Sequence, residues 1–388
     1  MNKKNKFETI AIHIGNEPDS SAGSVSPPIH LTSTYVQDGI GKNKGYDYSR
    51  GNNPTRARLE ENIAALEGGF DAIAFASGMA ATTALFQNLK KGDHVIVSRN
   101  VYGGTYRMAT QVLSHHGIDF DFVDTTDIEN IKKAIKSETK WVFIETPTNP
   151  MLEITDIKAV SEICANSDIK FAVDNTFMSS YGQRPLEYGA DCVMHSSTKF
   201  ISGHSDVLGG VLVAKDKGLA DRLHFIQKSG GAIPSPFDAW LLLRSVKTMS
   251  MRVQKASDNA MVIAKYFEDH NRIVKTIYPG LSSHPQHQIA KKQQINPHGE
   301  ILFGSMVSVV FESRNDLEHF ISKIKLFSLA ESLGGVESLM SVPYFMTHAD
   351  VPKDVKAEMN LVPELLRLAV GVEHIDDLIT DIEGALLN

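Results

Sequence analysis

The chain has 388 residues, of which 42% are hydrophobic and 22% charged, which predicts a sizeable core and two or three domains. Its 39 basic and 46 acidic residues give a net charge of −7, and no basic block follows the opening "MNKKNK". Nucleic acid is therefore excluded as the main partner, because phosphate binding needs a basic face. Neither a signal peptide nor a membrane span is expected, since no run approaches roughly 18 apolar residues.

Residues 1–55 are rich in Ser, Gly, Asn and Pro and contain few periodic apolar positions, as in "SSAGSVSPPIHLTSTY" and "YDYSRGNNPT". This composition predicts an extended arm, because little of it could bury a face of its own. A helix is expected next, over "PTRARLEENIAALEG", with Pro54 near its start and Gly68 as its C-cap.

Short apolar runs alternate with helical or loop segments between residues 70 and 215. They predict seven strands: 72–76, 94–98, 119–123, 141–145, 170–174, 192–196 and 209–214. Near-continuous apolar strands between helices are typical of a mostly parallel sheet covered on both faces. The sequence therefore predicts one large α/β domain over residues 56–255.

A long helical pattern over 236–270 leads out of this domain. The remainder, residues 256–388, mixes strand patterns ("SMVSVVFE", "LRLAVGV") with amphipathic helices ("DLEHFISKIKLF", "IDDLITDIEGALL"). We expect a smaller C-terminal α/β domain there.

Polar and reactive residues gather where the predicted strands end. The clusters are Ser77–Met79, Asn100–Tyr106, Glu145–Asn149, Asp174–Thr176 and Ser196–Lys199. In open α/β sheets, ligands bind outside the carboxyl ends of the strands, so these clusters predict a shared site.

Three of these positions pose chemical questions. Lys199 follows the apolar run "ADCVM", so its amine either reaches the surface along its stem or is kept for its reactivity. Asp174 also ends a buried strand, and its carboxylate either caps a turn or pairs with a cationic ligand atom. The Ser77-Gly78 turn suits a phosphate at a helix start, although such turns are common. Neither GxGxxG after a strand nor GxxxxGK[ST] occurs.

The remaining metal and redox candidates favour ordinary structural roles. Histidines 284, 287 and 298 lie in a polar stretch without further ligands, so we expect them to be solvated and expect no metal site. Cys164 and Cys192 lack CxxC or histidine neighbours and are predicted to be reduced core residues, as in a cytoplasmic protein.

The ordered motifs "YSRGNNPTR", "SGMAA", "YGGTYR", "ETPTNP", "DNTF", "HSSTKFISGHSD", "SLGGVESL" and "LLRLAVGVE" cover essentially the whole chain. With them, the chain resembles the transsulfuration family of pyridoxal 5'-phosphate (PLP) enzymes, which act on cysteine and methionine precursors. The resemblance is closest to cystathionine γ-lyase and cystathionine γ-synthase. It implies PLP as cofactor, a fold-type I (aspartate aminotransferase-like) α/β fold, and a homotetramer of dimers that share active sites.

The resemblance also implies roles for individual residues. Lys199 would form the Schiff base with the cofactor, and Asp174 would pair with its pyridinium nitrogen. Tyr102 would stack on the ring, with its hydroxyl placed for proton transfer near the leaving sulfur. The implied cofactor site is completed by Ser77, Gly78, Met79, Thr176, Ser196 and Thr198, with Tyr48 and Arg50 reaching in from a neighbouring subunit through the arm.

For the substrate, the resemblance implies a small sulfur amino acid. Arg367 would bind its carboxylate bidentately, helped by Asn149 and Ser338. Arg107 and Glu337 would face its distal end.

Two positions bear on the reaction. Gly104 stands where methionine γ-lyases typically carry cysteine, and Glu337 matches the acidic residue of γ-lyases and γ-synthases that many β-lyases replace with an aromatic one. We therefore expect a cystathionine γ-lyase, with cystathionine γ-synthase and then β-lyase as alternatives. A non-enzymatic binding protein would require the loss of Lys199 or Asp174, and both are present.

Overall fold

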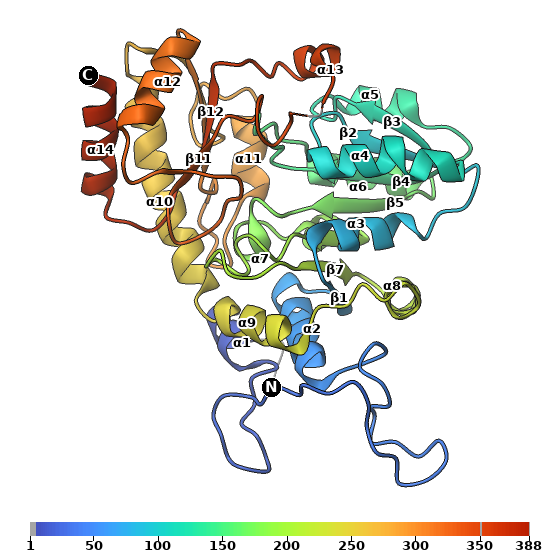
Figure 1. The fold of residues 1–388 in the computed structure, drawn as a ribbon. Helices are drawn as coiled ribbons and strands as arrows, with labels where there is room; N and C mark the ends of the chain where they lie inside the picture. Colours follow the sequence, from blue (N-terminus) through green and yellow to red (C-terminus); the bar gives the residue numbers. More distant parts are fainter. Residues whose placement is uncertain (1–4, 350, 388) are drawn as a thin grey trace.

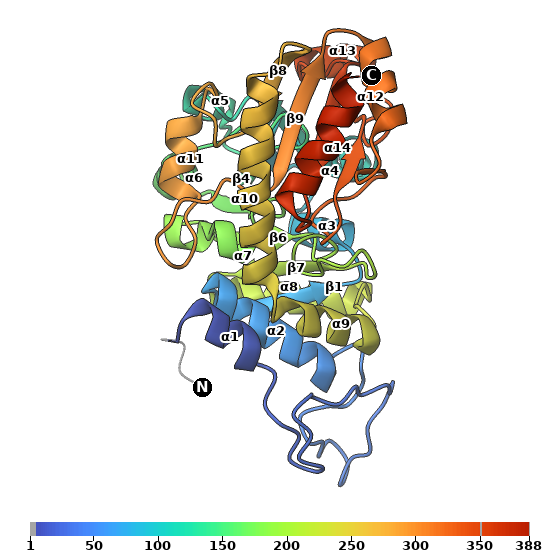
Figure 2. The same cartoon turned by 90° about the vertical axis from the view of Figure 1, so that its left-hand side faces the viewer.

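A computed structural model describes residues 5–349 and 351–387, so residues 1–4 of the predicted arm lie outside it. Two sheets, each with its own helices, lie side by side and are linked by a long helix (Figures 1 and 2). The α-helices are α1 (Phe7–His13), α2 (Pro54–Glu67), α3 (Gly78–Phe86), α4 (Gly103–Gln111), α5 (Ile128–Ala134), α6 (Ile157–Asn166), α7 (Ser179–Gly182), α8 (Lys217–Gly230), α9 (Pro236–Val246), α10 (Met249–Glu268), α11 (His287–Gln293), α12 (Arg314–Lys323), α13 (Lys353–Glu358) and α14 (Ile375–Leu387). Two short 3₁₀ helices are η1 (Leu113–His116) and η2 (Pro185–Tyr188).

The larger sheet confirms all seven predicted strands. They are β1 (Asp71–Phe75), β2 (His94–Ser98), β3 (Asp119–Val123), β4 (Thr139–Glu145), β5 (Lys170–Asp174), β6 (Cys192–His195) and β7 (Gly210–Ala214). The order is β1-β7-β6-β5-β4-β2-β3, and only β7 runs antiparallel to its neighbours. The carboxyl ends of β4, β5 and β6 therefore meet at one edge.

Alternate side chains of each strand pack against helices on opposite faces of this sheet. On β2, Val95 and Val97 belong to the core with α3 and α8, whereas Ile96 packs with α5 and α6. Burial on both faces explains why these strands are almost continuously apolar in the sequence.

The smaller sheet has the order β10-β11-β12-β9-β8 and is mostly antiparallel. Its strands are β8 (Ile273–Ile277), β9 (Met306–Phe311), β10 (Ser328–Leu329), β11 (Leu339–Ser341) and β12 (Leu365–Ala369). The helices α10, α12 and α14 share a core with it. The predicted boundary between residues 255 and 256 falls inside α10, so that helix joins the two parts; the boundary itself stays a prediction.

The helix expected over 236–270 is two helices, because the ladder breaks at residues 247–248. The Ser245 carbonyl accepts hydrogen bonds from the Thr248 amide, the Thr248 hydroxyl and the Arg252 guanidinium. These donors replace the regular i+4 amide, and α10 starts afresh at Met249.

The arm is only partly extended. Its first segment forms α1, whose Phe7, Ile10 and Ala11 are buried. The Asn62 side chain on α2 donates to the carbonyls of Ile10, Ala11 and Ile14, which fastens α1 to the body. Beyond it, residues 17–52 project from the body on the side of α1, α2 and α9 (Figure 1). The expectation of an extended arm thus fails for α1, because three apolar residues at helical spacing suffice to dock it.

Two further expectations have mixed outcomes. Cys164 and Cys192 are buried and unpaired, as predicted. His284 was expected in solvent but is buried, with Nε2 3.1 Å from the Leu152 carbonyl, and burial lowers its pKa to about 4. The described residues contain no group of three or more His, Cys, Asp or Glu placed to hold a metal. None of the described helices combines the length and apolar character needed to cross a membrane.

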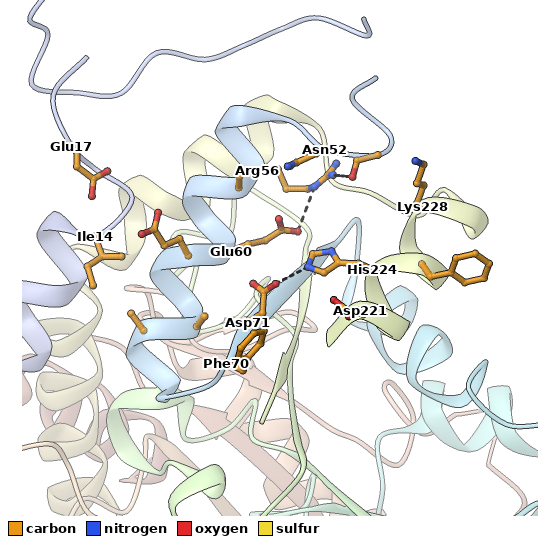
Figure 3. A pocket seen from close by; sticks show the side chains of 16 residues that line it. Ile14, Glu17, Asn52, Arg56, Glu60, Phe70, Asp71, Asp221, His224 and Lys228 are labelled. Atoms are coloured by element: carbon orange, nitrogen blue, oxygen red, sulfur yellow. Dashed lines mark hydrogen bonds and ion pairs between the residues drawn. The ribbon is translucent and has the colours of Figure 1, made fainter. Parts of the chain in front are cut away.

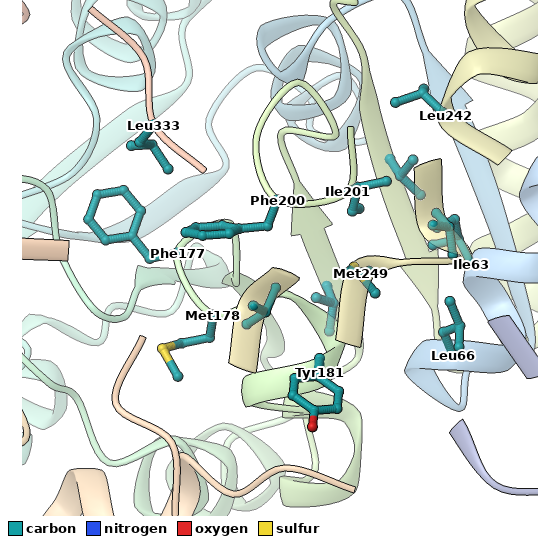
Figure 4. Close-up of a cluster of buried hydrophobic side chains, with 14 of the residues drawn as sticks. Ile63, Leu66, Phe177, Met178, Tyr181, Phe200, Ile201, Leu242, Met249 and Leu333 are labelled. Atoms are coloured by element: carbon teal, nitrogen blue, oxygen red, sulfur yellow. The ribbon is translucent and has the colours of Figure 1, made fainter. Parts of the chain in front are cut away.

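One apolar cluster joins the two sheets. It runs from Ile63 and Leu66 on α2 past Phe200 to Phe177 and Leu333 (Figure 4). The last two side chains also line a cavity at the strand ends, so the shared core forms part of its wall.

Ile63→Ala should lower the midpoint of thermal unfolding clearly, because deleting a buried isoleucine at 1% exposure costs about 2–5 kcal/mol. Ile12→Ala is the matched control, since Ile12 on α1 is 44% exposed and its truncation should have little effect. Calorimetry of both variants tests this, and equal midpoints would contradict a core built on α2.

Candidate active site

A cavity of about 340 Å³ lies at the carboxyl ends of β4, β5 and β6, against the smaller sheet. It brings together most of the residues that the sequence singled out. Those lining it are Ser77, Gly78, Met79, Tyr102, Asn149, Asp174, Thr176, Ser196, Thr198, Lys199 and Arg367.

Lys199 points its amine into the structure and not to the surface. Its Nζ donates to the Ser332 hydroxyl at 2.8 Å. Burial, with the nearby positive charge of Arg367, lowers the pKa of Lys199 to about 8, although Glu331 opposes the shift. A lysine with this pKa exchanges a proton near neutral pH, which is the chemistry that the strand-end position suggested.

Asp174 is held with one oxygen spare. The Thr176 amide and hydroxyl both donate to its Oδ1, at 3.0 and 2.5 Å. Among the described residues, none donates a hydrogen bond to Oδ2. Burial raises the pKa of Asp174, so a cation beside Oδ2 would stabilise its charged form. A pyridine nitrogen that carries a proton meets that need.

The start of α3 forms an anion cradle. Ser77 caps the helix, with its hydroxyl accepting from the Ala80 amide at 3.1 Å, which leaves the amides of Gly78 and Met79 in the first turn. A Cβ on Gly78 would lie 2.9 Å from the Cβ and Oγ of Ser196, so only glycine lets the helix approach that loop. Helix amides with two hydroxyl groups, those of Ser196 and Thr198, fit a phosphate.

Arg367 leaves β12 and crosses to the larger sheet. Its Nη1 donates to Asn149 Oδ1 at 2.8 Å and its Nη2 to the Ser332 carbonyl at 2.9 Å, while its buried Nε has no hydrogen-bond partner. Burial lowers its pKa to about 10, which keeps it charged at neutral pH. A charged guanidinium with a vacant N–H suits a carboxylate.

Some implied substrate residues lie elsewhere. Ser338, expected beside Arg367, instead donates its hydroxyl and amide to Glu373, at 2.9 and 2.6 Å. Glu337 lines an adjoining groove of about 460 Å³ and accepts from the Ser205 hydroxyl. Arg107 lies on α4 and does not line the cavity.

Tyr48 and Arg50 are not brought to the cavity of their own chain. They border a separate surface hollow on the projecting segment, where the guanidinium lies 5.5 Å from the Tyr48 ring centre. Arg50 Nη1 also donates to the Lys228 carbonyl at 2.6 Å. Their implied role in a neighbouring subunit stays a prediction.

Several residues that line the cavity have no role implied by the resemblance, among them Glu331 and Ser332. Glu331 and Ser332 come from the loop before "LGGVES", where no local pattern shows which side chain faces the cavity. Ser332 has a φ of 106°, a conformation that L-residues rarely adopt. Glu145, which the sequence places in one of the strand-end clusters, ends the apolar strand β4 just as Asp174 ends β5.

The chain is similar over nearly its full length to known proteins of one family. Residues 8–387 match the model of the family described as "Cys/Met metabolism PLP-dependent enzyme". The chain is 46% identical over 380 residues to a cystathionine beta-lyase of Lactococcus lactis subsp. cremoris, covering 98% of each chain. It is 45% identical over 383 residues to a cystathionine gamma-lyase of Bacillus subtilis, covering 99% of this chain and all of that protein.

A crystal structure of cystathionine gamma synthase from Xanthomonas oryzae pv. oryzae, in complex with aminoacrylate and cysteine, superposes with a TM-score of 0.95 at 38% identity, covering 98% of each chain. The sheet order and the second, smaller sheet are thus those of fold-type I PLP enzymes. On these matches over nearly its full length, the chain belongs to the family of PLP-dependent enzymes of cysteine and methionine metabolism.

Proposed function

We propose that the protein is a cystathionine γ-lyase, which cleaves L-cystathionine with water to cysteine, 2-oxobutyrate and ammonia. The observation that carries the proposal is that one cavity holds Lys199, Arg367 and Glu331 together. Cystathionine has an amino-acid group at each end, so a guanidinium can bind the carboxylate at the reacting end while a carboxylate attracts the distal ammonium. The mixed names of the relatives are compatible with γ-lyase, β-lyase and γ-synthase.

We assign the cofactor to the residues that fit it. Lys199 would hold its aldehyde carbon, Asp174 its ring nitrogen, and the α3 amides with Ser196 and Thr198 its phosphate. Tyr102, at the start of α4, would cover the ring face. When bound, PLP supplies an electron sink for the carbon that loses a proton.

The chain itself supplies proton transfer and orientation. Lys199, with a pKa of about 8, can take a proton from the α carbon and, once it has passed that proton on, a second one from the β carbon, as γ elimination requires before sulfur leaves the γ carbon. Ser332, 2.8 Å from its Nζ, holds the amine in place between these transfers. Arg367 and Asn149 fix the substrate carboxylate, which keeps the reacting carbons within reach.

Two features of the wall bear on the choice of reaction. A Cβ on Gly104 would lie 2.6 Å from the Tyr102 ring and 2.8 Å from Met79 Sδ, so a cysteine there would force rearrangement and methionine γ-lyase activity is disfavoured. The protein carboxylate that attracts the distal ammonium of the substrate is assigned to Glu331 and not to Glu337. Glu331 lines the cavity, whereas Glu337 lines only the adjoining groove.

The active unit is proposed to be a dimer, assembled further into a tetramer. The projecting segment exposes Val25, Leu31, Val36 and Ile40, side chains that favour a covered position. It also carries Tyr48 and Arg50, which suit a phosphate of a second copy. The two reduced, buried cysteines favour a reducing compartment such as the cytoplasm.

With the cofactor removed, Lys199 should capture added PLP at a rate that follows the fraction of neutral amine, since only the unprotonated nitrogen attacks the aldehyde. Because its pKa is about 8, the rate should rise between about pH 7 and 8 and level off above about pH 9. Borohydride fixation and mass spectrometry of the Lys199 peptide measure this rate.

Labelling of Lys215, which is exposed, provides the reference for an ordinary surface amine. Lys199→Ala should lose the fixed cofactor but keep its fold. Capture at Lys199 that climbs steadily to about pH 10 would refute the low pKa.

Incubation with cystathionine should yield mainly cysteine and 2-oxobutyrate. Glu331→Ala should raise KM about tenfold, because it removes a charge-assisted contact to the distal ammonium. Glu337→Ala is the matched control and should change KM little, since Glu337 lies in the adjoining groove. Product chromatography and steady-state kinetics measure both effects.

Other product patterns would replace the proposal. Mainly homocysteine and pyruvate would make the protein a β-lyase. Slow cleavage beside rapid formation of cystathionine from an activated homoserine ester and cysteine would make it the γ-synthase.

Isolated mixed dimers of Arg50→Ala and Lys199→Ala subunits should show about half of the unmodified activity, because a hybrid holds one site of two with both residues intact. Mixing Lys199→Ala with Arg367→Ala is the control, since these residues line the same cavity of one chain and cannot complement. Co-expression with two affinity tags isolates the hybrids. Activity no greater than in the control mixture would argue against a shared site.

A further inference from the structure

Glu145 is a buried carboxyl group of the cavity that the proposed chemistry leaves without a task. It ends β4 directly beside Asp174, its register partner on β5, and is 4% exposed. Two carboxyl groups side by side in a buried site repel each other when both are charged. Such a pair is unfavourable unless hydrogen bonds or a neutral form of one group offset the repulsion.

Both oxygens of Glu145 are engaged by backbone amides of two different loops. Oε2 accepts from the Tyr102 amide at 2.8 Å, and Oε1 accepts from the Asn149 amide at 2.9 Å. One end of this bridge is the residue that begins α4, and the other is the residue whose side chain accepts from Arg367. The carboxyl group thereby spans the cavity floor between the ring-covering loop and the carboxylate anchor.

From this geometry we propose that Glu145 is a positioning residue for substrate-carboxylate recognition: it fixes the Asn149 loop, through which it sets the guanidinium of Arg367. The inference rests on the proposed role of Arg367 as carboxylate anchor. Glu145 accepts from the Asn149 amide, and Asn149 Oδ1 accepts from Nη1 of Arg367 at 2.8 Å, so these two contacts connect Glu145 with the guanidinium. The Tyr102 amide in turn fixes Glu145.

The charge of the site agrees with such a role. Burial, together with the neighbouring Asp174 charge, raises the pKa of Glu145 well above its ordinary value. This shift favours the neutral form of Glu145 and so reduces the repulsion on the charge of Asp174, where the cofactor nitrogen is expected. Its contribution then comes from the span between the two amides and depends little on charge.

The test compares Glu145→Gln and Glu145→Asp in the holoenzyme. Glutamine keeps the length but loses one acceptor, and aspartate keeps the carboxyl group but is one methylene too short to reach both amides. Glycine carries a carboxylate and methylamine does not, and binding of each is followed through the cofactor absorbance. We expect glycine to bind about tenfold more weakly to both variants, while methylamine affinity changes less than twofold.

Glu60→Gln is the matched control. Glu60 is also a buried carboxyl group that accepts a backbone amide, from Ala74 at 2.9 Å, and burial raises its pKa. It lies on α2 beside Arg56, on the wall of a different cavity near His224 and Asp71 (Figure 3). Its variant should bind glycine as the unmodified enzyme does.

A double-mutant cycle separates positioning from general damage. Asn149→Ala removes the acceptor of Arg367, so combining it with Glu145→Gln should weaken glycine binding no further than the larger single effect. Additive effects, an equal loss of methylamine affinity, or full glycine affinity in Glu145→Asp would each overturn the proposal. Because glycine binding needs no particular elimination, these outcomes stand apart from the choice between lyase and synthase.

Should Glu145→Gln fail to fold, thermal melting and the Glu145→Asp variant distinguish a positioning role of Glu145 from general damage to the site. If both variants melt early, the apoprotein affinity for PLP is measured as well. A positioning role predicts a change in PLP affinity of no more than about threefold, whereas collapse of the site would abolish PLP binding and overturn the inference.

Discussion

Arg367 extends from the smaller sheet and places its guanidinium 2.8 Å from Asn149 on the larger one, with its second amino group 2.9 Å from the Ser332 carbonyl. This contact between two sheets is buried, so the loss of Asn149 would leave the buried Arg367 charge without one of its two acceptors. The cavity exists because the sheets meet here. The residues proposed to face the cofactor come from the larger sheet, and the proposed carboxylate anchor, Arg367, comes from the smaller one.

The same meeting of sheets sets the electrostatics. Lys199 and Arg367 bring two cationic groups into the cavity, while Glu145 and Asp174 bring two carboxyl groups on adjacent strands. Desolvation disfavours the charged form of these groups. It therefore lowers the pKa of Lys199 and raises the pKa of Glu145 and of Asp174. A protein that held these groups only for stability would do better with apolar residues, so their arrangement indicates chemistry.

Relatives of nearly equal identity bear different reaction names, and the geometry shows why the family is easier to establish than the reaction. Lys199, Asp174 and the α3 cradle serve what all PLP chemistry needs. We propose that the reaction depends on other parts of the wall, where Glu331 and Ser332 line the cavity and Gly104 lies against Tyr102 and Met79. Small differences in that wall change which bond is aligned for cleavage.

The sequence by itself determined the elements and the centre of the site. The seven strands can be predicted because burial on both faces makes each one apolar. Lys199 and Asp174 can be singled out because a charged residue at the end of a buried strand is unfavourable unless it is paired or hydrogen-bonded. Cofactor residues on strand ends converge whatever the loops do, since parallel strands bring their carboxyl ends to one edge.

Only the tertiary structure decided which loop side chains reach that edge. Glu331 lines the cavity while Glu337 bonds to Ser205, and Ser338 turns to Glu373; the three belong to one short loop of the smaller domain. Their directions depend on the backbone of Ser332, at a φ of 106°, and on how the two sheets pack. Neither leaves a periodic pattern in the chain, because contacts between residues far apart in sequence create them.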